Sequence, residues 1–584
     1  MASTNTLNSA SFYHFSIAQY LLKTILAFVF FLLPTSISIA KIKSLHSNWI
    51  FCQQGKNSWY KATVPGTVHT DLLQNKIIQD PFIADHLENT QWVQQSSWIY
   101  KTSFILCEEE YTSQYALLVF EGLDTYASVY LNGQLILEAN NMFRTYKPDV
   151  SNKLKQTNEI VIIFHPVLAL ADSLAKLDKI KRPCENNRHY IRKAQYHFGW
   201  DWAPEILTMG IWRPINLYLN ESPKTNETKT QNIALIREKD SIGESFYFTI
   251  NHKPSYIIGA NWVPADVFLP RITRNKYRQL LVAAKEAGIQ MLRVWGGGIY
   301  EQNDFYELCD SLGLLVWQDF MFAGAMYPAD SQFLSNVEAE LRDNITRLRA
   351  FQCIVLWCGN NEIDEAWHNW GWQKQFNLSP ADSATLWKDY QYLFHQKIPD
   401  LLNELDPQRP YVTTSPIYGW GREQSMTDGD SHYWGVWWGL QPKEVFCDKV
   451  PRFMSEMGMQ AMPNFESIQQ FVPTSQQFLF STILLSHQKH PTGFETIDHY
   501  LKQEKMSYTD IKSYIQATQT LQAKVLHTAL QAQYYSQGRC MGSLWWQWND
   551  CWPVCSWSIV DYYGNAKRSY RTLKQFTSCI QPRK

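Results

Sequence analysis

The sequence predicts a multidomain chain of β and α/β type, in which an N-terminal β-sandwich precedes a (β/α)8 barrel. Three observations support this prediction. The 584 residues are enough for a barrel of about 250 residues and at least one further domain. Short β-branched and aromatic runs fill residues 41–219. Strand and helix patterns then alternate over residues 246–584.

Residues 41–219 carry the pattern of a sandwich. Runs rich in β-branched, leucine and aromatic residues occur at 115–120, 127–131 and 159–164. The pair Asn132-Gly133 follows the second run and is a strong hairpin signal. Short strands at this spacing are typical of two packed sheets. The polar segment 220–245 comes next, and we interpret it as a linker or as the remnant of another domain.

The second half of the chain repeats strand, loop and helix. Apolar residues recur at three- and four-residue spacing in the stretches 275–287 and 333–351, which we expect to be helical. The stretch 566–580 is the expected eighth helix. Eight candidate strands complete the barrel pattern: 256–263, 291–295, 314–319, 354–357, 411–414, 432–436, 452–455 and 542–546.

Residues 1–40 read as a secretory signal peptide. An apolar run at 25–33 follows Lys23 and precedes the small-residue exit Ser38-Ile39-Ala40. This run is too short to cross a bilayer, so we expect no stable membrane insertion once the signal is removed. Four sequons are candidate glycosylation sites, at Asn220, Asn226, Asn344 and Asn377.

The composition excludes several classes of function. Lys plus Arg total 53 against 54 for Asp plus Glu, so no broad basic field attracts nucleic acid. The 11 cysteines lack zinc-site spacing, and we interpret His432 as a pocket histidine rather than a metal ligand. We therefore expect no metal and no cofactor. The aromatic content of 15%, with 24 Trp, favours a ligand with flat apolar faces, such as a sugar.

Two glutamates follow predicted barrel strands, where the chemistry of such barrels is located. Glu362 follows an apolar strand and a Gly-Asn-Asn turn, and Glu456 ends the run 452–455. Two carboxylates that converge across a pocket can cleave a glycosidic bond. One protonates the leaving oxygen, and the other attacks the sugar or activates water. The sequence leaves retention and inversion both open, and either glutamate could instead form a structural ion pair.

A set of motifs resembles glycoside hydrolase family 2 and, within it, the β-mannosidases. The similarity covers roughly residues 45–576 and is carried by Gly199-Trp-Asp-Trp-Ala-Pro204, Asn261-Trp-Val-Pro264, Arg293-Val-Trp-Gly-Gly-Gly298, Asn361-Glu362, Ser455-Glu456 and Trp545-Trp-Gln-Trp-Asn-Asp550. The resemblance implies a jelly-roll, sugar-binding-like sandwich and retaining hydrolysis of terminal non-reducing β-D-mannose residues from N-glycan-derived oligosaccharides. With the signal peptide, it also implies a lysosomal or secreted enzyme.

The resemblance also implies roles for individual residues. Glu362 is the expected acid/base and Glu456 the expected nucleophile. Asn361 is expected to bind the sugar 2-hydroxyl. Six further residues are expected to contact the substrate or the nucleophile: Asp201 and Trp202 from the sandwich, Trp295, Trp370 and Trp546 as aromatic walls, and Tyr433 as a hydrogen-bond donor to the nucleophile.

The chain departs from the family pattern in its domain content. The resemblance implies an immunoglobulin-like domain between sandwich and barrel and further β domains after the barrel, whereas only residues 220–245 separate the two predicted units. This pattern suggests a splice product or an incomplete gene model, and it leaves the docking of the sandwich on the barrel open. Two alternatives therefore remain, an inactive sugar-binding form and a related exo-β-glucosaminidase or β-galactosidase.

Overall fold

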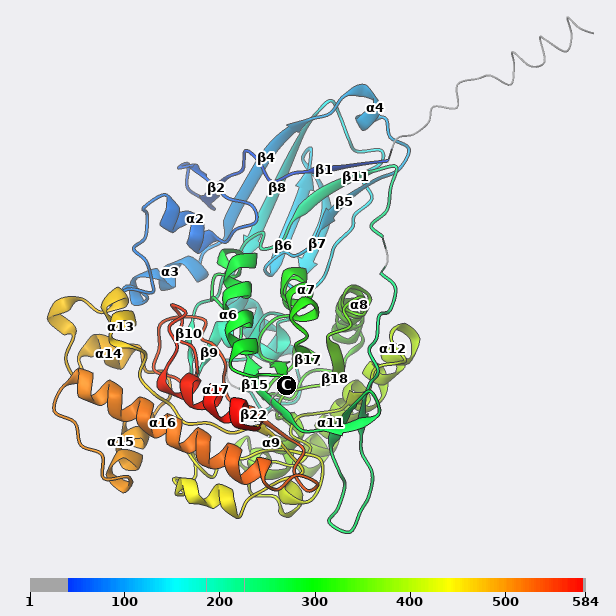
Figure 1. The fold of residues 1–584 in the computed structure, drawn as a ribbon. Helices are drawn as coiled ribbons and strands as arrows, with labels where there is room; N and C mark the ends of the chain where they lie inside the picture. Colours follow the sequence, from blue (N-terminus) through cyan, green and yellow to red (C-terminus); the bar gives the residue numbers. More distant parts are fainter. Residues whose placement is uncertain (1–39, 185, 225, 581–584) are drawn as a thin grey trace, which may run out of the picture.

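The computed structural model describes residues 40–580 apart from positions 185 and 225. The described chain folds into a β-sandwich seated on a larger α/β barrel, as Figure 1 shows. The predicted signal peptide lies outside the described residues except for Ala40. A search of the described helices finds none that combines the length and the apolar character needed to span a membrane.

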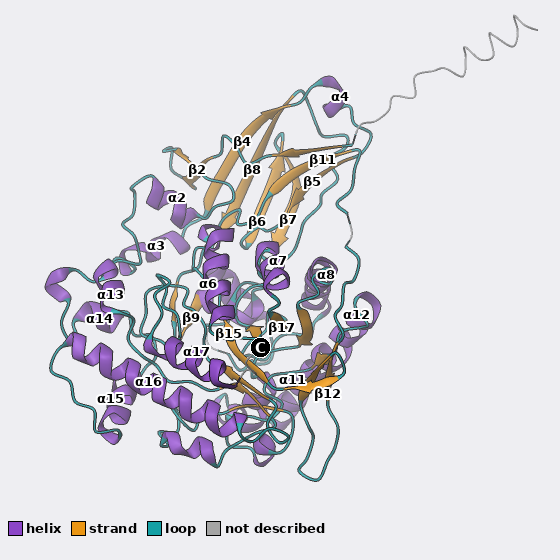
Figure 2. Ribbon diagram, viewed as in Figure 1, coloured by secondary structure: helices purple, strands orange, loops and turns teal. Residues whose placement is uncertain are grey.

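The sandwich consists of two antiparallel sheets, drawn in orange at the top of Figure 2. The smaller sheet has the order β1 (Lys41–Ser44), β11 (Ile215–Leu219) and β5 (Ala116–Phe120). The larger sheet has the order β3 (Tyr60–Lys61), β2 (Ile50–Gln53), β4 (Trp98–Ile105), β8 (Thr157–His165), β6 (Tyr126–Leu131) and β7 (Gln134–Asn140). Four short helices accompany them: α2 (Val68–Gln74), α3 (Gln91–Gln94), α4 (Glu108–Tyr111) and α5 (Val167–Leu177).

Strand β8 shows why this sequence forms a sandwich. Its residues alternate between buried and more exposed positions, so Ile160, Ile162 and Phe164 enter the core between the sheets. Each fully buried side chain of this kind stabilises the fold by roughly 1.5–3 kcal/mol. The predicted hairpin is confirmed as well, because Asn132 and Gly133 join β6 to β7 with positive φ angles of 53° and 79°. This is the conformation that an Asn-Gly turn favours.

Eight parallel strands form the barrel, and the predicted fold is confirmed. Their order in the ladder is β19 (Tyr411–Val412), β18 (Ile354–Cys358), β17 (Leu315–Asp319), β16 (Met291–Val294), β15 (Ile257–Trp262), β22 (Gly542–Trp545), β21 (Phe453–Glu456) and β20 (Asp430–His432). The first strand, β15, pairs with the last, β22. At the two ends of the ladder, the segment that follows β19 is joined to β20 by side chains, since Ser415 Oγ donates to Asp430 Oδ2 at 2.7 Å.

The sixth strand differs from its prediction. It lies at Asp430–His432 rather than at 432–436, and the chain turns after His432. The sequence does not indicate that the strand starts at Asp430, because a carboxylate is rare inside a barrel wall. In the structure, hydroxyl and backbone donors satisfy this buried carboxylate.

Helices surround the barrel, and Figure 1 shows α6, α7 and α8 below the sandwich. The predicted helices 275–287, 333–351 and 566–580 correspond to α6, α8 and α17. The barrel helices are α6 (Arg274–Glu286), α7 (Asn303–Leu312), α8 (Ser331–Leu348), α9 (Ile363–Asn369), α10 (Trp372–Gln375), α11 (Pro380–Gln391), α12 (Ile398–Leu405), α13 (Phe465–Phe471), α14 (Thr482–Ser486), α15 (Gly493–Gln503), α16 (Ile511–Tyr534) and α17 (Arg568–Ile580).

The segment between sandwich and barrel is more structured than a linker. Residues 233–236 form β12 (Ile233–Ile236), which pairs with β13 (Tyr247–Ile250), and β13 pairs with β14 (Lys253–Ser255). Phe246 and Phe248 contact Phe453 with ring centroids 5.3 and 6.0 Å apart, so this sheet covers the amino end of the barrel. Strand β12, which lies within the predicted segment 220–245, thus belongs to a small sheet packed on the barrel, and the predicted boundary at residues 245 and 246 stays a prediction.

The sandwich docks on the opposite end of the barrel through its last loops. The buried guanidinium of Arg192 pairs with Glu340 of α8, with 2.6 Å between Nη2 and Oε1. The backbone N–H of Tyr196 donates to the carbonyl of Gly297 at 3.1 Å. These contacts bring the hairpin of β9 (Phe198–Trp200) and β10 (Ala203–Glu205) to the barrel mouth. The sandwich therefore docks on the barrel mouth, a contact that the sequence leaves open.

Candidate active site

A cavity of about 910 Å³ lies at the carboxyl ends of the barrel strands. Trp295, Glu362 and Glu456 line it from the barrel, and Trp200 and Asp201 line it from the β9–β10 hairpin. The site is therefore built from both domains, as the position of a barrel active site predicts.

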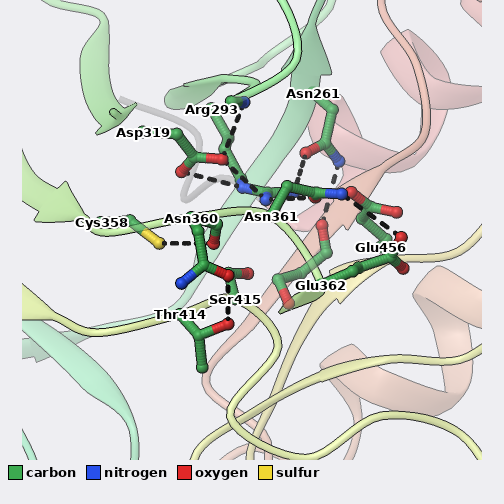
Figure 3. Close-up of polar contacts among 12 residues, drawn as sticks. Asn261, Arg293, Asp319, Cys358, Asn360, Asn361, Glu362, Thr414, Ser415 and Glu456 are labelled. Carbon is green, nitrogen blue, oxygen red and sulfur yellow. Dashed lines mark hydrogen bonds and ion pairs between the residues drawn. The ribbon is translucent and has the colours of Figure 1, made fainter. Parts of the chain in front are cut away.

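Glu362 and Glu456 converge in this cavity, although β18 and β21 are not neighbours in the ladder. One oxygen of each glutamate and Nδ1 of His432 lie within 4.8 Å of one another. Figure 3 shows the two carboxylates turned toward each other. A carboxyl separation of about 5–5.5 Å is typical of retaining glycosidases, while inverting enzymes need about 6.5–9.5 Å. The geometry therefore favours retention, the choice that the sequence leaves open.

Glu362 is held in an unusual backbone conformation. Its φ of 63° and ψ of 9° place it in the left-handed region, directly before α9. Such conformations cost energy in a non-glycine residue and occur often at functional sites. The backbone N–H of Glu362 donates to the Ser415 carbonyl at 2.8 Å, which anchors this turn to the end of β19.

Arg293 ties the nucleophile candidate to the barrel interior. Its guanidinium lies 2.6 Å from Glu456 Oε1, 2.8 Å from Asp319 Oδ2 and 2.8 Å from the Asn361 side-chain oxygen. Arg293 and Asp319 are fully buried. An adjacent guanidinium stabilises the ionised form of a carboxyl group. This contact therefore favours the carboxylate of Glu456.

The two catalytic candidates differ in their charge environment. Burial raises the pKa of Glu362 to about 7, and the charge of Arg293 and the Asn361 hydrogen bond oppose this shift only partly. Burial and the charge of Glu362 raise the pKa of Glu456 to about 7 as well, while the direct ion pair with Arg293 opposes the rise. Two such close carboxyls titrate as a coupled pair that shares a proton near neutral pH. Because Arg293 contacts Glu456, the proton belongs on Glu362.

Asp201 reaches the cavity from the sandwich, as predicted. Burial raises its pKa to about 8, and the nearby charges of Glu362 and Glu456 add to this rise. Its carboxyl group is therefore protonated at neutral pH and can donate a hydrogen bond.

Aromatic rings form the cavity walls. Trp295 and Trp546 line the cavity and are almost fully buried, as predicted. Trp370 lies at the rim with 47% of its surface exposed. Trp202 is fully buried behind Trp295, with ring centroids 5.4 Å apart, and it does not line the cavity. The prediction that Trp202 contacts the substrate is wrong, because its neighbour Trp200 occupies that position.

Tyr433 also differs from its prediction. Its hydroxyl donates to Gln441 Oε1 at 2.6 Å, and its ring packs on Phe446 rather than lining the cavity. Only its backbone meets the nucleophile, through a hydrogen bond from its N–H to the carbonyl of Glu456. The preceding residue, His432, faces the site instead. The strand ends at His432, and His432 rather than Tyr433 directs its side chain into the cavity.

The residues that the sequence does not assign to the site include Trp200, which lines the cavity, and Arg293, which pairs with Glu456. His432, which is predicted to be a pocket histidine, has its Nδ1 2.9 Å from Glu362 Oε1. A signal for Arg293 exists in the sequence, because it is a charged residue within the otherwise apolar strand Met291–Val294. Charged residues are seldom buried without a paired charge.

Glu362, His432 and Glu456 are also grouped closely enough to hold a metal ion. The expected acid/base and nucleophile roles would use both carboxylates, and Arg293 already provides positive charge beside Glu456. The expectation that the protein needs no metal or cofactor stays a prediction.

The four sequons differ in accessibility. Asn377 is exposed, and Asn220 and Asn226 are half-buried. Asn344 is buried within α8, where its amide nitrogen donates to the carbonyls of Phe143 and Glu340, both at 2.9 Å. The prediction that Asn344 is a glycosylation site is wrong for the folded chain, because its side chain fills a domain contact.

Comparison with known proteins relates these features to a family. The family described as "Glycosyl hydrolase 2 galactose-binding domain-like" matches residues 49–213. Beta-mannosidase B of Thermothelomyces thermophilus is 32% identical over 652 aligned positions, which cover 91% of this chain and 76% of that protein. Beta-mannosidase B of Emericella nidulans is 31% identical over 644 positions, with 90% and 76% covered. Both alignments are longer than this chain, so these relatives contain residues without a counterpart here.

Solved structures show the same relationship. The crystal structure of a β-D-mannosidase from Dictyoglomus thermophilum matches with a TM-score of 0.85 and 34% identity, covering 93% of this chain and 79% of that one. An exo-chitosanase from Amycolatopsis orientalis matches with a TM-score of 0.69 and 14% identity, covering 92% and 73%. The second likeness shows the shared fold alone.

Proposed function

This chain belongs to glycoside hydrolase family 2 and to its β-mannosidase group, and we propose that it removes terminal non-reducing β-D-mannose residues from β-mannosides such as N-glycan-derived oligosaccharides. The observation that carries the proposal is the convergence of oxygens of Glu362 and Glu456 within 4.8 Å at the barrel mouth. This separation suits a retaining double displacement.

In the first step, Glu456 attacks the anomeric carbon while Glu362 donates its proton to the glycosidic oxygen. The bond to the aglycone breaks, and an ester bond forms between the sugar and Glu456. The ion pair with Arg293 keeps Glu456 ionised for attack, and burial keeps Glu362 protonated for acid catalysis. The pair thus begins the cycle in the required charge states.

In the second step, Glu362, now ionised, removes a proton from water. The water oxygen attacks the anomeric carbon, Glu456 leaves, and mannose is released with its β configuration retained. Arg293 fixes the Asn361 amide by holding its oxygen, which directs the Asn361 nitrogen toward Glu362 at 3.3 Å. We assign this nitrogen to the sugar 2-hydroxyl.

The walls of the cavity support removal of a terminal sugar. Trp200 of the hairpin packs edge-on against Trp295, with ring centroids 4.9 Å apart. The two rings form one continuous part of the cavity wall, against which a terminal sugar can pack. Asp201 stands beside this wall and can donate a hydrogen bond to a sugar hydroxyl.

The proposal is tested by comparing aryl β-glycosides of mannose, glucosamine and galactose with the full chain. We expect the highest kcat/KM for the mannoside and release of β-mannose before mutarotation, followed by proton NMR. Glu456→Gln is the matched control and should abolish turnover of all three. A preference for glucosamine or galactose would reject the substrate assignment, and first release of α-mannose would reject the retaining mechanism.

For the compartment, we propose the lysosome, reached through the secretory pathway, or secretion. Support comes from the signal-like sequence at 1–40 and from the exposed sequon at Asn377. Fractionation of cells that express the chain with a C-terminal tag tests this proposal. Retention of residues 1–40 in a cytosolic product would contradict it.

A further inference from the structure

We propose that Asp430 and Ser415 act through His432 as a hydrogen-bonded relay that holds the acid proton of Glu362 in place. The inference rests on the proposed acid/base role of Glu362. It assigns positioning roles to three residues that do not act on the sugar themselves.

The relay is a continuous chain of buried contacts. Ser415 Oγ lies 2.7 Å from Asp430 Oδ2 and 3.2 Å from His432 Nε2. His432 Nδ1 lies 2.9 Å from Glu362 Oε1. Asp430, Ser415 and His432 are all buried, so water does not compete for these hydrogen bonds.

The donors around Asp430 determine which group donates and which accepts at each hydrogen bond of the relay. Its carboxylate accepts from Ser415 Oγ, from Ser455 Oγ at 2.5 Å and from the Ile417 N–H at 2.9 Å. An ionised carboxylate only accepts, and a serine hydroxyl has one hydrogen to give. Because Ser415 gives its hydrogen to Asp430, its oxygen must accept from His432. Nε2 of His432 therefore carries the imidazole hydrogen.

This tautomer determines what His432 offers to Glu362. Burial lowers the pKa of His432 to about 4, so the imidazole is neutral at neutral pH. With its hydrogen on Nε2, the ring presents a lone pair at Nδ1. The 2.9 Å contact is then a hydrogen bond only if Glu362 is protonated and donates. The relay thus stabilises the acid form of Glu362.

Other charged groups face the same pair. Glu456 from β21 lies 3.4 Å from His432 Nδ1, and Arg293 from β16 lowers the pKa of Glu362. Asp201 from the hairpin and Glu365 from α9 interact electrostatically with Glu362. These groups influence how readily Glu362 ionises. None of them determines which nitrogen of His432 carries the hydrogen, because the contact with Ser415 does so.

The relay also serves the second step. Once Glu362 has given its proton to the leaving oxygen, its carboxylate faces the Nδ1 lone pair. This contact is unfavourable and raises the affinity of Glu362 for a proton. Glu362 is therefore a stronger base when it activates water.

The variant Ser415→Ala tests the relay in the full chain. Without the serine oxygen, His432 can move its hydrogen to Nδ1 and donate to the Glu362 carboxylate. We expect the basic limb of the kcat/KM profile to shift by about one pH unit toward acid. The matched control is Ser455→Ala, which removes a hydroxyl from the same Asp430 oxygen but leaves the contact between Ser415 and His432. An unshifted limb in Ser415→Ala, or an equal shift in both variants, would overturn the relay.

A second measurement does not depend on turnover. Nitrogen-15 NMR of histidine-labelled wild-type protein distinguishes the two neutral tautomers, and His432→Gln identifies the signal. We expect Nε2–H in the wild type and a move toward Nδ1–H in Ser415→Ala. A wild-type signal from Nδ1–H would overturn the relay even if Glu362 is the acid/base. If the wild-type protein shows the Nε2–H signal but does not hydrolyse β-mannosides, the relay stands and the proposed function is rejected.

Discussion

Arg293 Nη1 lies 2.6 Å from Glu456 Oε1, and both residues are buried. Burial raises the pKa of both glutamates to about 7, and this contact is what distinguishes them, because only Glu456 pairs directly with a cation. Glu456 pairs with a permanent cation, whereas Glu362 contacts a histidine that burial keeps neutral. The proposed division into nucleophile and acid rests on this one ion pair at the centre of the barrel mouth.

Replacing Arg293 with methionine tests this division. Glu456 and Asp319 would lose their partner, and an uncompensated buried charge costs about 3–5 kcal/mol of folding free energy. We expect kcat/KM to fall by about 100-fold or more, because a preorganised charge at the reacting group is lost. Arg274→Met is the control, since Arg274 pairs with acidic residues at the surface. Near-normal kcat/KM in Arg293→Met would contradict the role of the ion pair.

The Glu362→Gln variant separates the acid role from the nucleophile role. We expect a loss of about 100- to 10,000-fold on an unactivated mannoside, because proton donation to the leaving oxygen is removed. An aryl mannoside with a good leaving group should still form the intermediate, and azide should accelerate its breakdown to β-mannosyl azide. Steady-state rates and product analysis measure both effects. Azide rescue of Glu456→Gln with the same stereochemistry would reverse the two assignments.

The stability of the folded chain should fall as pH rises. Burial and the neighbouring carboxylates raise the pKa of Asp201 from 3.8 to about 8 in the folded state. Its stabilising contribution is therefore complete below the unfolded pKa and is lost as pH rises through about 8. Glu362 acts in the same direction, with a pKa near 7. Thermal melts between about pH 5 and about pH 8 should show a falling Tm.

The Asp201→Asn variant is the control for this pH dependence. It removes one of the titrating groups, so its Tm should fall less steeply than that of the wild type. An equal slope in the two proteins would show that Asp201 does not titrate in this range.

Glycan mapping tests the accessibility of the sequons. When a eukaryotic cell secretes the chain, we expect a glycan at the exposed Asn377 and none at the buried Asn344. A glycan at Asn344 would break its hydrogen bonds to Phe143 and Glu340. Mass spectrometry of tryptic peptides, before and after enzymatic deglycosylation, measures occupancy at each site. Full occupancy of Asn344 in folded protein would contradict the domain contact.

The ends of the predicted strands indicate the two glutamates proposed as catalytic, but not the residues that contact them. Glu362 and Glu456 follow apolar strands, and parallel strands bring such ends together at one rim. The sequence carries a signal for Arg293, a charge within an apolar strand, but no pattern that pairs it with Glu456. The relay of Ser415 and Asp430 depends on contacts between β19 and β20, which no local pattern specifies.

Errors in the predicted site arose where side-chain direction mattered. Trp200 and Trp202 lie on one short hairpin, and only the docked structure decides which ring lines the cavity. The resemblance implies a role for Tyr433, but its hydroxyl turns away to Gln441 and only its backbone meets Glu456. Asn344 has the sequon pattern but lies in a helix that packs against the sandwich. Each error concerns a tertiary contact, which sequence patterns do not determine.

Covalent trapping tests the central claim most directly. A mannosyl fluoride with fluorine in place of the 2-hydroxyl should form the ester with the nucleophile but hydrolyse it very slowly. After digestion of the inactivated chain, mass spectrometry should find the fluorosugar on the peptide that contains Glu456. It should be absent when Glu456→Gln is treated in the same way. A label on Glu362, or inactivation without any labelled glutamate, would contradict the account.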